Sequence, residues 1–85
     1  MKIAYKATFI KKLNRLNLEL QGEVFQKIEL FRNPTNHKLL RVHKLHGQFK
    51  TCYSFSVNYQ IRIIFEYLSK NEAVLLTIGD HQIYQ

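Results

Sequence analysis

Three segments in the second half of the chain have the patterns of consecutive β-strands. Apolar and polar residues alternate over residues 52–57 and again over residues 59–68, as expected of strands with one buried face. Residues 73–78 are almost continuously apolar, which is typical of a strand covered on both faces. Asn58 and residues 69–71 separate the segments and predict tight turns. The second half therefore predicts an antiparallel meander.

The first half predicts one short strand and two helices. Residues 2–6 alternate like a strand, and Thr8 is a suitable N-cap for the helix that follows. Asn17 is a second cap candidate. The helix after it carries one apolar stripe, formed by Leu20, Val24, Ile28 and Phe31. Asn33 and Pro34 end this helix, because proline cannot continue the helical hydrogen bonds.

The linking segment predicts a further strand and completes the fold. Residues 39–45 mix apolar and basic side chains, and Gly47 with Gln48 offers a turn. The order of elements is then β-α-α-β-β-β-β. It predicts an α+β fold in which an N-terminal strand and a helical hairpin pack on a mainly antiparallel sheet. A chain of 85 residues has room for one hydrophobic core, so residues 1–85 are expected to form a single domain.

The composition narrows the class of protein further. Cys52 is the one cysteine, so the chain cannot form an intramolecular disulfide, and it suits a reducing compartment. No apolar run approaches the roughly 18 residues that a membrane span requires. The first ten residues lack the apolar stretch of a signal peptide. We therefore expect a cytoplasmic protein.

Positive charge is concentrated in the middle of the chain. The formal net charge is +7, from 13 lysines and arginines against 6 acids. Residues 30–65 contain no acid, and their bases are Arg32, Lys38, Arg41, Lys44, Lys50 and Arg62. A concentrated positive region attracts polyanions. The charge alone leaves nucleic acid, an anionic membrane and an acidic protein open as partners, beside an ordinary solvated surface.

Arg62 is the first candidate for chemistry. It is expected in the middle of a strand whose other face is apolar, where a guanidinium is well placed to hold a phosphate through two parallel hydrogen bonds. The simpler alternative is an exposed sheet arginine paired with Glu66 or Asp80.

A basic cluster before the turn is the second candidate. Histidine exchanges a proton near neutral pH, and lysine offsets phosphate charge, so His43, Lys44 and His46 suit acid–base work on a phosphate. Arg41 and His43 would share a face of a strand because they are two residues apart. The alternative is a polar strand edge.

The last residues form the third candidate. Gly79 and Asp80 follow the apolar run, and His81 after them could protonate a leaving oxygen. Tyr84 could stack on a base or bind a phosphate. The alternative is an ordinary frayed C-terminus.

Other chemistries find less support in the sequence. The histidines match no zinc-finger or HExxH spacing, and Cys52 has no second thiolate, so no metal or other cofactor is expected. Ser54 and Ser56 alternate on a strand without a nucleophile-elbow motif.

The whole pattern resembles the RelE/ParE superfamily, the toxins of bacterial type II toxin–antitoxin systems. The resemblance covers nearly the whole length. It is carried by the helical hairpin ending at Asn33-Pro34, and by residues 43–47 (HKLHG), 52–57 (CYSFSV), 59–65 (YQIRIIF) and 78–84 (IGDHQIY). The resemblance implies a RelE-like fold and an mRNA-cleaving endoribonuclease, mostly acting in the ribosomal A site, in which the 2′-hydroxyl of the RNA attacks the phosphodiester. It also implies an acidic antitoxin as partner.

The resemblance also implies roles for individual residues. His43 matches the position of a glutamate or histidine base, and Arg62 matches the arginine that stabilises the phosphate. His81 matches the C-terminal histidine acid, and Tyr84 the terminal aromatic residue that orients the substrate. The RNA and phosphate contacts implied are Arg41, Lys44, His46 and Lys50.

The resemblance also includes a branch with another activity. RelE-like members carry two lysines where this chain has Ser54 and Ser56, and YafQ-like members carry an acid and a histidine, so His43 is the candidate base. ParE-like members share the fold, lack the nuclease residues and inhibit DNA gyrase. A ParE-like gyrase inhibitor, or a basic domain that only binds RNA, is therefore the alternative.

Overall fold

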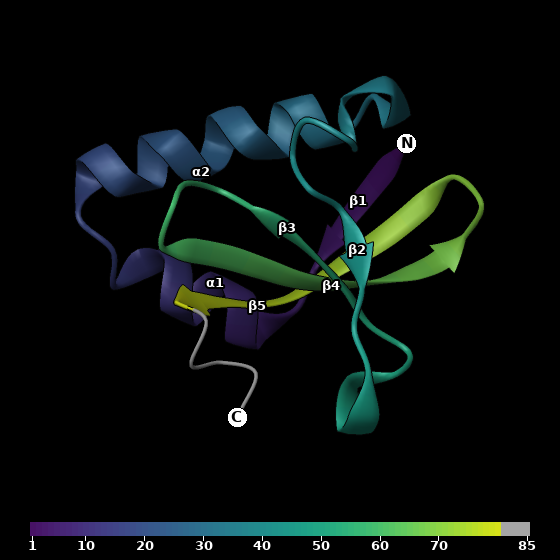
Figure 1. Ribbon diagram of the computed structural model, residues 1–85. Helices are drawn as coiled ribbons and strands as arrows, with labels where there is room; N and C mark the ends of the chain where they lie inside the picture. The colour runs from purple at the N-terminus through teal and green to yellow at the C-terminus, as the bar shows by residue number, and fades with distance from the viewer. Residues whose placement is uncertain (81–85) are drawn as a thin grey trace.

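Two helices lie against one face of a five-stranded mixed sheet in the computed structural model, which describes residues 1–80 (Figure 1). The sheet has the order β1-β5-β4-β3-β2. The elements are β1 (Lys2–Tyr5), α1 (Ala7–Asn14), α2 (Leu18–Phe31), β2 (His43–Lys44), β3 (Tyr53–Ser56), β4 (Ile61–Ser69) and β5 (Glu72–Asp80), with short 3-10 helices at Pro34–Asn36 and Gly47–Phe49. The predicted α+β fold and antiparallel meander are confirmed.

The two ends of the described chain meet in the sheet. β2, β3, β4 and β5 pair as antiparallel neighbours, while β1 runs parallel to β5. Ile3 lies opposite Ala73 in this parallel pair. A parallel pair requires a crossover connection, and the helical hairpin begins that connection.

The predicted N-cap is correct for one helix and wrong for the other. Asn17 caps α2 as predicted, since its side-chain oxygen accepts a hydrogen bond from the amide of Leu20 at 2.8 Å. The prediction of Thr8 as the cap of α1 is wrong, because α1 begins at Ala7 and its N-cap is Lys6, two residues earlier than predicted. The amide of Lys6 still bonds to β5, so the helix starts directly where the strand ends. The hydroxyl of Thr8 instead donates to the carbonyl of Leu76, at 2.7 Å.

The predicted strand over residues 39–45 is mostly wrong. Only His43–Lys44 pairs with β3, and residues 37–41 form turns before it. Leu40 is buried in the core, and its carbonyl accepts from the amide of Ser56 at 2.8 Å. Arg41, the last residue of these turns, has a left-handed backbone with φ 59°.

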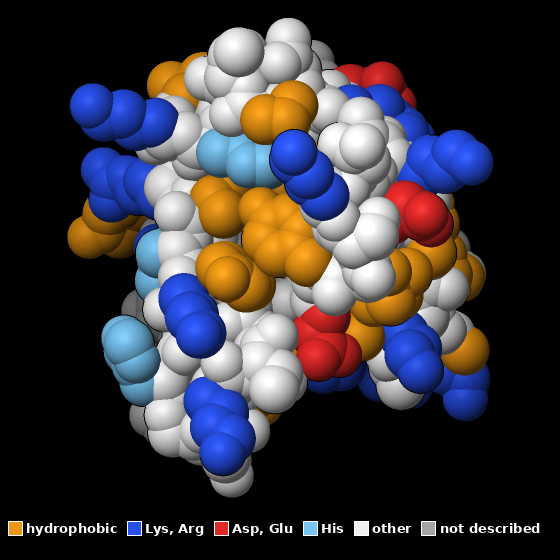
Figure 2. Space-filling view, turned by 90° about the vertical axis from the view of Figure 1, so that its right-hand side faces the viewer, with side chains coloured by type: hydrophobic (Ala, Val, Ile, Leu, Met, Phe, Trp, Pro, Cys, Tyr) orange, Lys and Arg blue, Asp and Glu red, His pale blue; other side chains and the backbone are white. Residues whose placement is uncertain are grey.

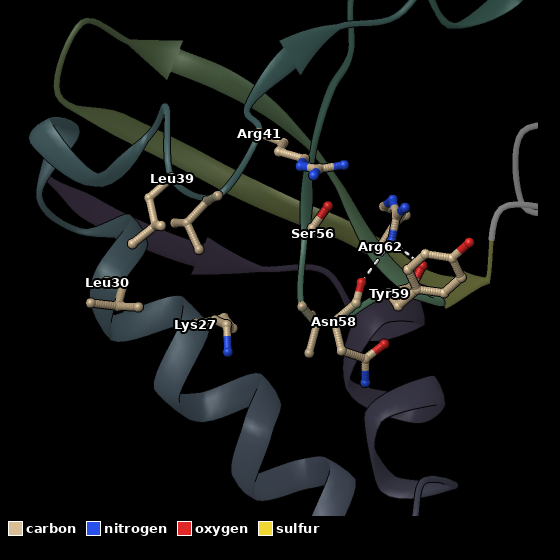
Figure 3. A pocket seen from close by; sticks show the side chains of 10 residues that line it. Lys27, Leu30, Leu39, Arg41, Ser56, Asn58, Tyr59 and Arg62 are labelled. Carbon is tan, nitrogen blue, oxygen red and sulfur yellow. Dashed lines mark hydrogen bonds between the residues drawn. The ribbon is translucent and has the colours of Figure 1, made fainter.

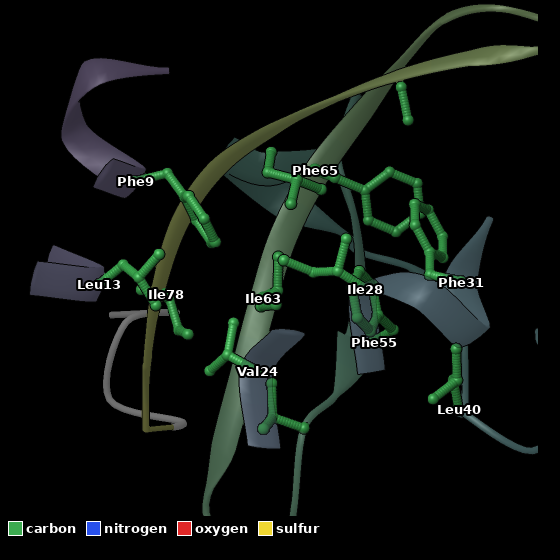
Figure 4. Close-up of a cluster of buried hydrophobic side chains, with 13 residues drawn as sticks. Phe9, Leu13, Val24, Ile28, Phe31, Leu40, Phe55, Ile63, Phe65 and Ile78 are labelled. Carbon is green, nitrogen blue, oxygen red and sulfur yellow. The ribbon is translucent and has the colours of Figure 1, made fainter. Parts of the chain in front are cut away.

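The main core lies between the helices and the sheet. Figure 4 shows side chains from α1, α2 and three strands converging there. Phe31 is fully buried at its centre, stacked on Phe55 with ring centroids 4.4 Å apart and edge-on to Phe65 at 4.7 Å. The predicted stripe of α2 and the alternation of β3 and β4 supply this core.

A smaller apolar cluster lies on the opposite face of the sheet, which we call the open face. Leu45, Cys52 and Ile64 are buried there, with Phe49 and Leu76 packed against them. Cys52 is a free thiol and packs as a small apolar residue. None of the described helices is long and apolar enough to cross a membrane.

Candidate functional site

The sheet register places His43 and Arg62 on the same open face. His43 lies opposite Ser54 across β2 and β3, and Arg62 lies opposite Ser56 across β3 and β4. Directly paired residues share a face, and so do residues two apart on one strand. Cys52, two residues before Ser54, belongs to the open-face cluster. The two serines therefore form a short polar row that joins the histidine to the arginine.

The imidazole of His43 is held by a backbone carbonyl. Nδ1 lies 2.8 Å from the carbonyl oxygen of Arg41, and a carbonyl only accepts, so the neutral ring carries its proton on Nδ1. Nε2 then keeps its lone pair and lies 3.5 Å from the hydroxyl of Ser54. The side chain is exposed. This tautomer can accept a proton from a ligand on the open face.

Arg62 is fixed at the start of β4 and not in the middle of the strand. Nη1 donates to the carbonyls of Asn58, Tyr59 and Ile61, at 2.8, 3.1 and 3.3 Å. Within residues 1–80, the hydrogen bonds of this side chain all use Nη1, and the ion pair found joins Arg32 to Glu29. The guanidinium is thus held by carbonyls and not by the carboxylates considered from the sequence. Its remaining N–H groups suit an anion.

The other predicted contacts are divided between several places. Lys44 lies opposite Tyr53, which packs against the main core, so the register puts Lys44 on the other face from His43. His46 and Lys50 flank the 3-10 helix Gly47–Phe49, as its exposed N-cap and C-cap residues. Arg41 is exposed and lies outside the strands. The prediction that Arg41 and His43 share a face of one strand is therefore wrong, although the carbonyl of Arg41 holds the imidazole of His43.

His81 and Tyr84 lie outside the described residues. The described chain ends at Asp80, which pairs with Ile61, and Gly79 lies opposite Arg62. The roles predicted for the two C-terminal residues therefore stay predictions.

A pocket of about 790 Å³ adjoins Arg62, beyond the edge of β3 (Figure 3). It is lined by Lys27, Leu30, Leu39, Leu40, Arg41, Ser56, Val57, Asn58, Tyr59 and Arg62. Sequence analysis missed Lys27 and Tyr59. Lys27 comes from α2, which is distant in sequence from every candidate, and only the observation that Tyr59 follows a predicted turn could have pointed to an exposed ring.

Two further observations concern ionisable groups. Burial raises the pKa of Tyr67 above its usual value, and the neighbouring Tyr53 adds to the effect. Among residues 1–80, no three histidine, cysteine, aspartate or glutamate side chains lie together as metal ligands would.

Positive side chains are not confined to the open face. Figure 2 shows a hydrophobic group on the side of the β4–β5 turn, with lysine or arginine, histidine and acidic side chains around it.

Solved structures identify the fold. The chain matches the E. coli DinJ–YafQ toxin–antitoxin complex with a TM-score of 0.75 at 17% identity, over 96% of this chain and 93% of that one. It matches the toxin–antitoxin complex RelBE2 from Mycobacterium tuberculosis with a TM-score of 0.71 at 15% identity, over 93% and 95%. It matches a conserved hypothetical protein from Helicobacter pylori with a TM-score of 0.70 at 20% identity, over 96% of both chains. No protein-family model and no curated protein matches the chain. The chain therefore has a RelE-like toxin fold.

Proposed function

We propose that this chain is the toxin of a toxin–antitoxin system and that it cleaves mRNA. The observation that carries the proposal is the open-face arrangement, in which the register puts His43 and Arg62 on the same face of the sheet, at the two ends of the row of Ser54 and Ser56. The RelE-like fold and the net charge of +7 support it, because toxin–antitoxin complexes share the fold and a basic protein attracts RNA.

The proposed reaction is a transesterification within the RNA. Nε2 of His43 accepts the proton of the 2′-hydroxyl, whose oxygen then attacks the adjacent phosphorus. Arg62 binds the phosphoryl oxygens as negative charge develops on them. The bond to the 5′-oxygen breaks, and His81 supplies the proton to that oxygen, leaving a 2′,3′-cyclic phosphate and a 5′-hydroxyl. Tyr84 orients the RNA, Lys50 contributes positive charge along its path, and His46 is a further contact; Lys44 lies on the other face of the sheet and is assigned no contact with this RNA.

The proposed regulator is an acidic antitoxin. Two of the matched structures are complexes of a toxin with its antitoxin. The chain contains 13 lysines and arginines against 6 acids, which favours an acidic partner. Such a partner on the open face would exclude RNA from His43 and Arg62.

The test is to map RNA ends after induction of the chain in E. coli. Wild type should stop growth and produce discrete new 5′-hydroxyl ends in transcripts. Replacing a positioned acid–base group typically costs about 10²- to 10⁴-fold in rate, and His43→Gln should show such a loss in vitro. Arg62→Lys keeps the charge and one donor for the turn carbonyls but loses the planar fork, and we expect a loss of about 10²-fold or more.

The matched control is Arg15→Ala. Arg15 is an exposed arginine at the end of α1, away from the open face, and its variant should cleave like wild type. Thermal melting of every variant checks that the chain is folded. Full cleavage by both His43→Gln and Arg62→Lys would remove the assigned roles. Growth arrest with intact transcripts and trapped gyrase–DNA complexes would establish the gyrase inhibitor instead.

A further inference from the structure

The pocket beside Arg62 combines positive charge with an exposed aromatic ring. Lys27 of α2, Arg41 of the turn before β2 and Arg62 of β4 bring three cations to it from separate elements. None of the described residues that line it is acidic. Tyr59 is 93% exposed at its rim, and Figure 3 shows the ring beside Arg62.

The turn that presents Tyr59 is held from within. The side-chain oxygen of Asn58 accepts from the amides of Gln60 and Ile61, each at 2.9 Å. The amide group of Asn58 donates to the carboxylate of Glu23 at 2.8 Å, which ties the turn to α2. The guanidinium of Arg62 adds three hydrogen bonds to carbonyls of the same turn. The backbone that carries Tyr59 is therefore held in place by hydrogen bonds before a ligand binds. A ligand that stacks on the ring does not pay the entropic cost of ordering the turn.

The pocket is continuous with the open face. Ser56 and Arg62 line the pocket and are also the cross-strand pair at the end of the polar row. A chain of phosphates that passes Arg62 can therefore extend into the pocket that Arg41 and Lys27 line. Leu30 and Leu39 form the apolar wall at the far end of the pocket (Figure 3).

Single-stranded RNA fits these features better than an acidic peptide does. Both ligands satisfy the cations, but the side chains of a carboxylate-rich peptide have no aromatic ring to stack on the exposed ring of Tyr59. Bases of single-stranded nucleic acids stack on aromatic side chains while lysine and arginine follow the backbone.

We propose that this pocket is a nucleotide subsite for single-stranded RNA, in which Lys27 and Arg41 contact a phosphate and Tyr59 stacks on a base. The subsite rests on the proposed function, because it binds the nucleotide next to the phosphate that Arg62 holds for cleavage. It assigns Lys27 and Tyr59 to substrate binding and not to the reaction itself.

The test measures binding of a labelled 2′-O-methyl RNA oligonucleotide, which cannot be cleaved, by fluorescence anisotropy of the full chain. Tyr59→Ala should raise the Kd roughly 5- to 150-fold, the effect expected for one stacked base. Tyr59→Phe keeps the ring and should bind within about twofold of wild type. Lys27→Ala should reduce the slope of log K against log salt by about 0.7, the value for one phosphate contact on a single strand.

Lys11→Ala is the matched lysine control, since Lys11 lies on the exposed side of α1 and outside the pocket. Wild-type RNA affinity and salt slope in both Tyr59→Ala and Lys27→Ala would overturn the subsite. Poly-glutamate is the second probe. An equal loss of poly-glutamate and RNA binding in Tyr59→Ala would also overturn it, because a peptide surface would then explain the pocket.

The outcome is separable from that of the proposed function. If cleavage is mapped in cells and the pocket variants bind the oligonucleotide like wild type, the proposed subsite is wrong and the proposed nuclease activity is supported. If the pocket variants lose binding as predicted but wild type cleaves no RNA, the proposed subsite is supported and the proposed nuclease activity is wrong.

Discussion

Phe31 shows how much of this small core depends on one side chain. It is fully buried and contacts rings on three other elements, Phe55 of β3, Phe65 of β4 and His37 in the turns after α2. The ring of His37 stacks on it at 4.8 Å, and Nε2 of His37 lies 2.9 Å from the carbonyl of Phe31. Removing the ring would leave a cavity that none of these planar neighbours can fill by a rotamer change.

We expect Phe31→Ala to lower the free energy of unfolding by about 3–5 kcal/mol, the range for a buried phenylalanine. The matched control is Phe25→Ala on the same helix. Phe25 is 53% exposed, and its loss should change the stability by about 0.5 kcal/mol or less. Urea unfolding followed by circular dichroism measures both. Equal effects of the two substitutions would contradict the assignment of Phe31 to the core.

Individual residues of the candidate site were only partly predictable. The alternation of β3 correctly put Ser54 and Ser56 on one face of that strand, because period-two patterns fix the face of every residue in a strand. That Arg62 shares this face follows only from the register of β3 with β4, which the alternation does not specify. The support of His43 by the carbonyl of Arg41 was not predictable. It depends on a left-handed arginine, a conformation that the residue type does not favour.

At the scale of elements, α2 is held at its start by side-chain hydrogen bonds. Asn17 caps the amide of Leu20, and the side chain of Gln21 donates to the carbonyl of Leu16 at 2.9 Å. α2 supplies Val24, Ile28 and Phe31 to the core and Lys27 to the pocket. Its position therefore matters to stability and to the site.

Asn17→Ala should cost about 1 kcal/mol of stability, because an amide of the first turn loses its acceptor. Asn17→Asp keeps an oxygen acceptor and adds a charge that the helix N-terminus favours, so it should be at least as stable as wild type. Thermal melting should show a drop of roughly 4–8 °C for the alanine variant. A similar drop in the aspartate variant would show that the cap is not the cause.

The elements that the sequence predicted well are those with long regular patterns. α2 has several helical turns, β3 and β4 alternate, and β5 contains a nearly continuous apolar run, so a single irregular residue does not hide the pattern. Residues 39–45 failed because burial of Leu40 by tertiary contacts decided their conformation. The pairing of β1 with β5 is non-local, and no local pattern in either strand specifies that partner.

At the scale of the whole molecule, positive charge is poorly balanced by internal pairs. The net charge is +7, and within residues 1–80 the ion pair found is the one between Arg32 and Glu29. The cations of the pocket and of the open face therefore repel one another across a protein of radius of gyration 11.8 Å. Such separations are comparable to the screening length at ordinary salt, about 10 Å at 0.1 M.

The melting temperature should therefore rise when salt is added at low concentration. Between about 0.01 M and 0.1 M NaCl the screening length falls from about 30 to about 10 Å, which weakens the repulsion in the folded state. A gain of about 1 kcal/mol would raise the melting temperature by roughly 4–8 °C. The control is the double variant Lys11→Glu and Lys12→Glu. Each change lowers the net charge by two, so the net charge falls from +7 to +3 and the salt-induced rise in melting temperature should be smaller. A melting temperature that falls with salt, or rises equally in the double variant, would show that self-repulsion is not significant. If the rise is found, the same repulsion gives an acidic partner a way to stabilise the fold simply by binding to it.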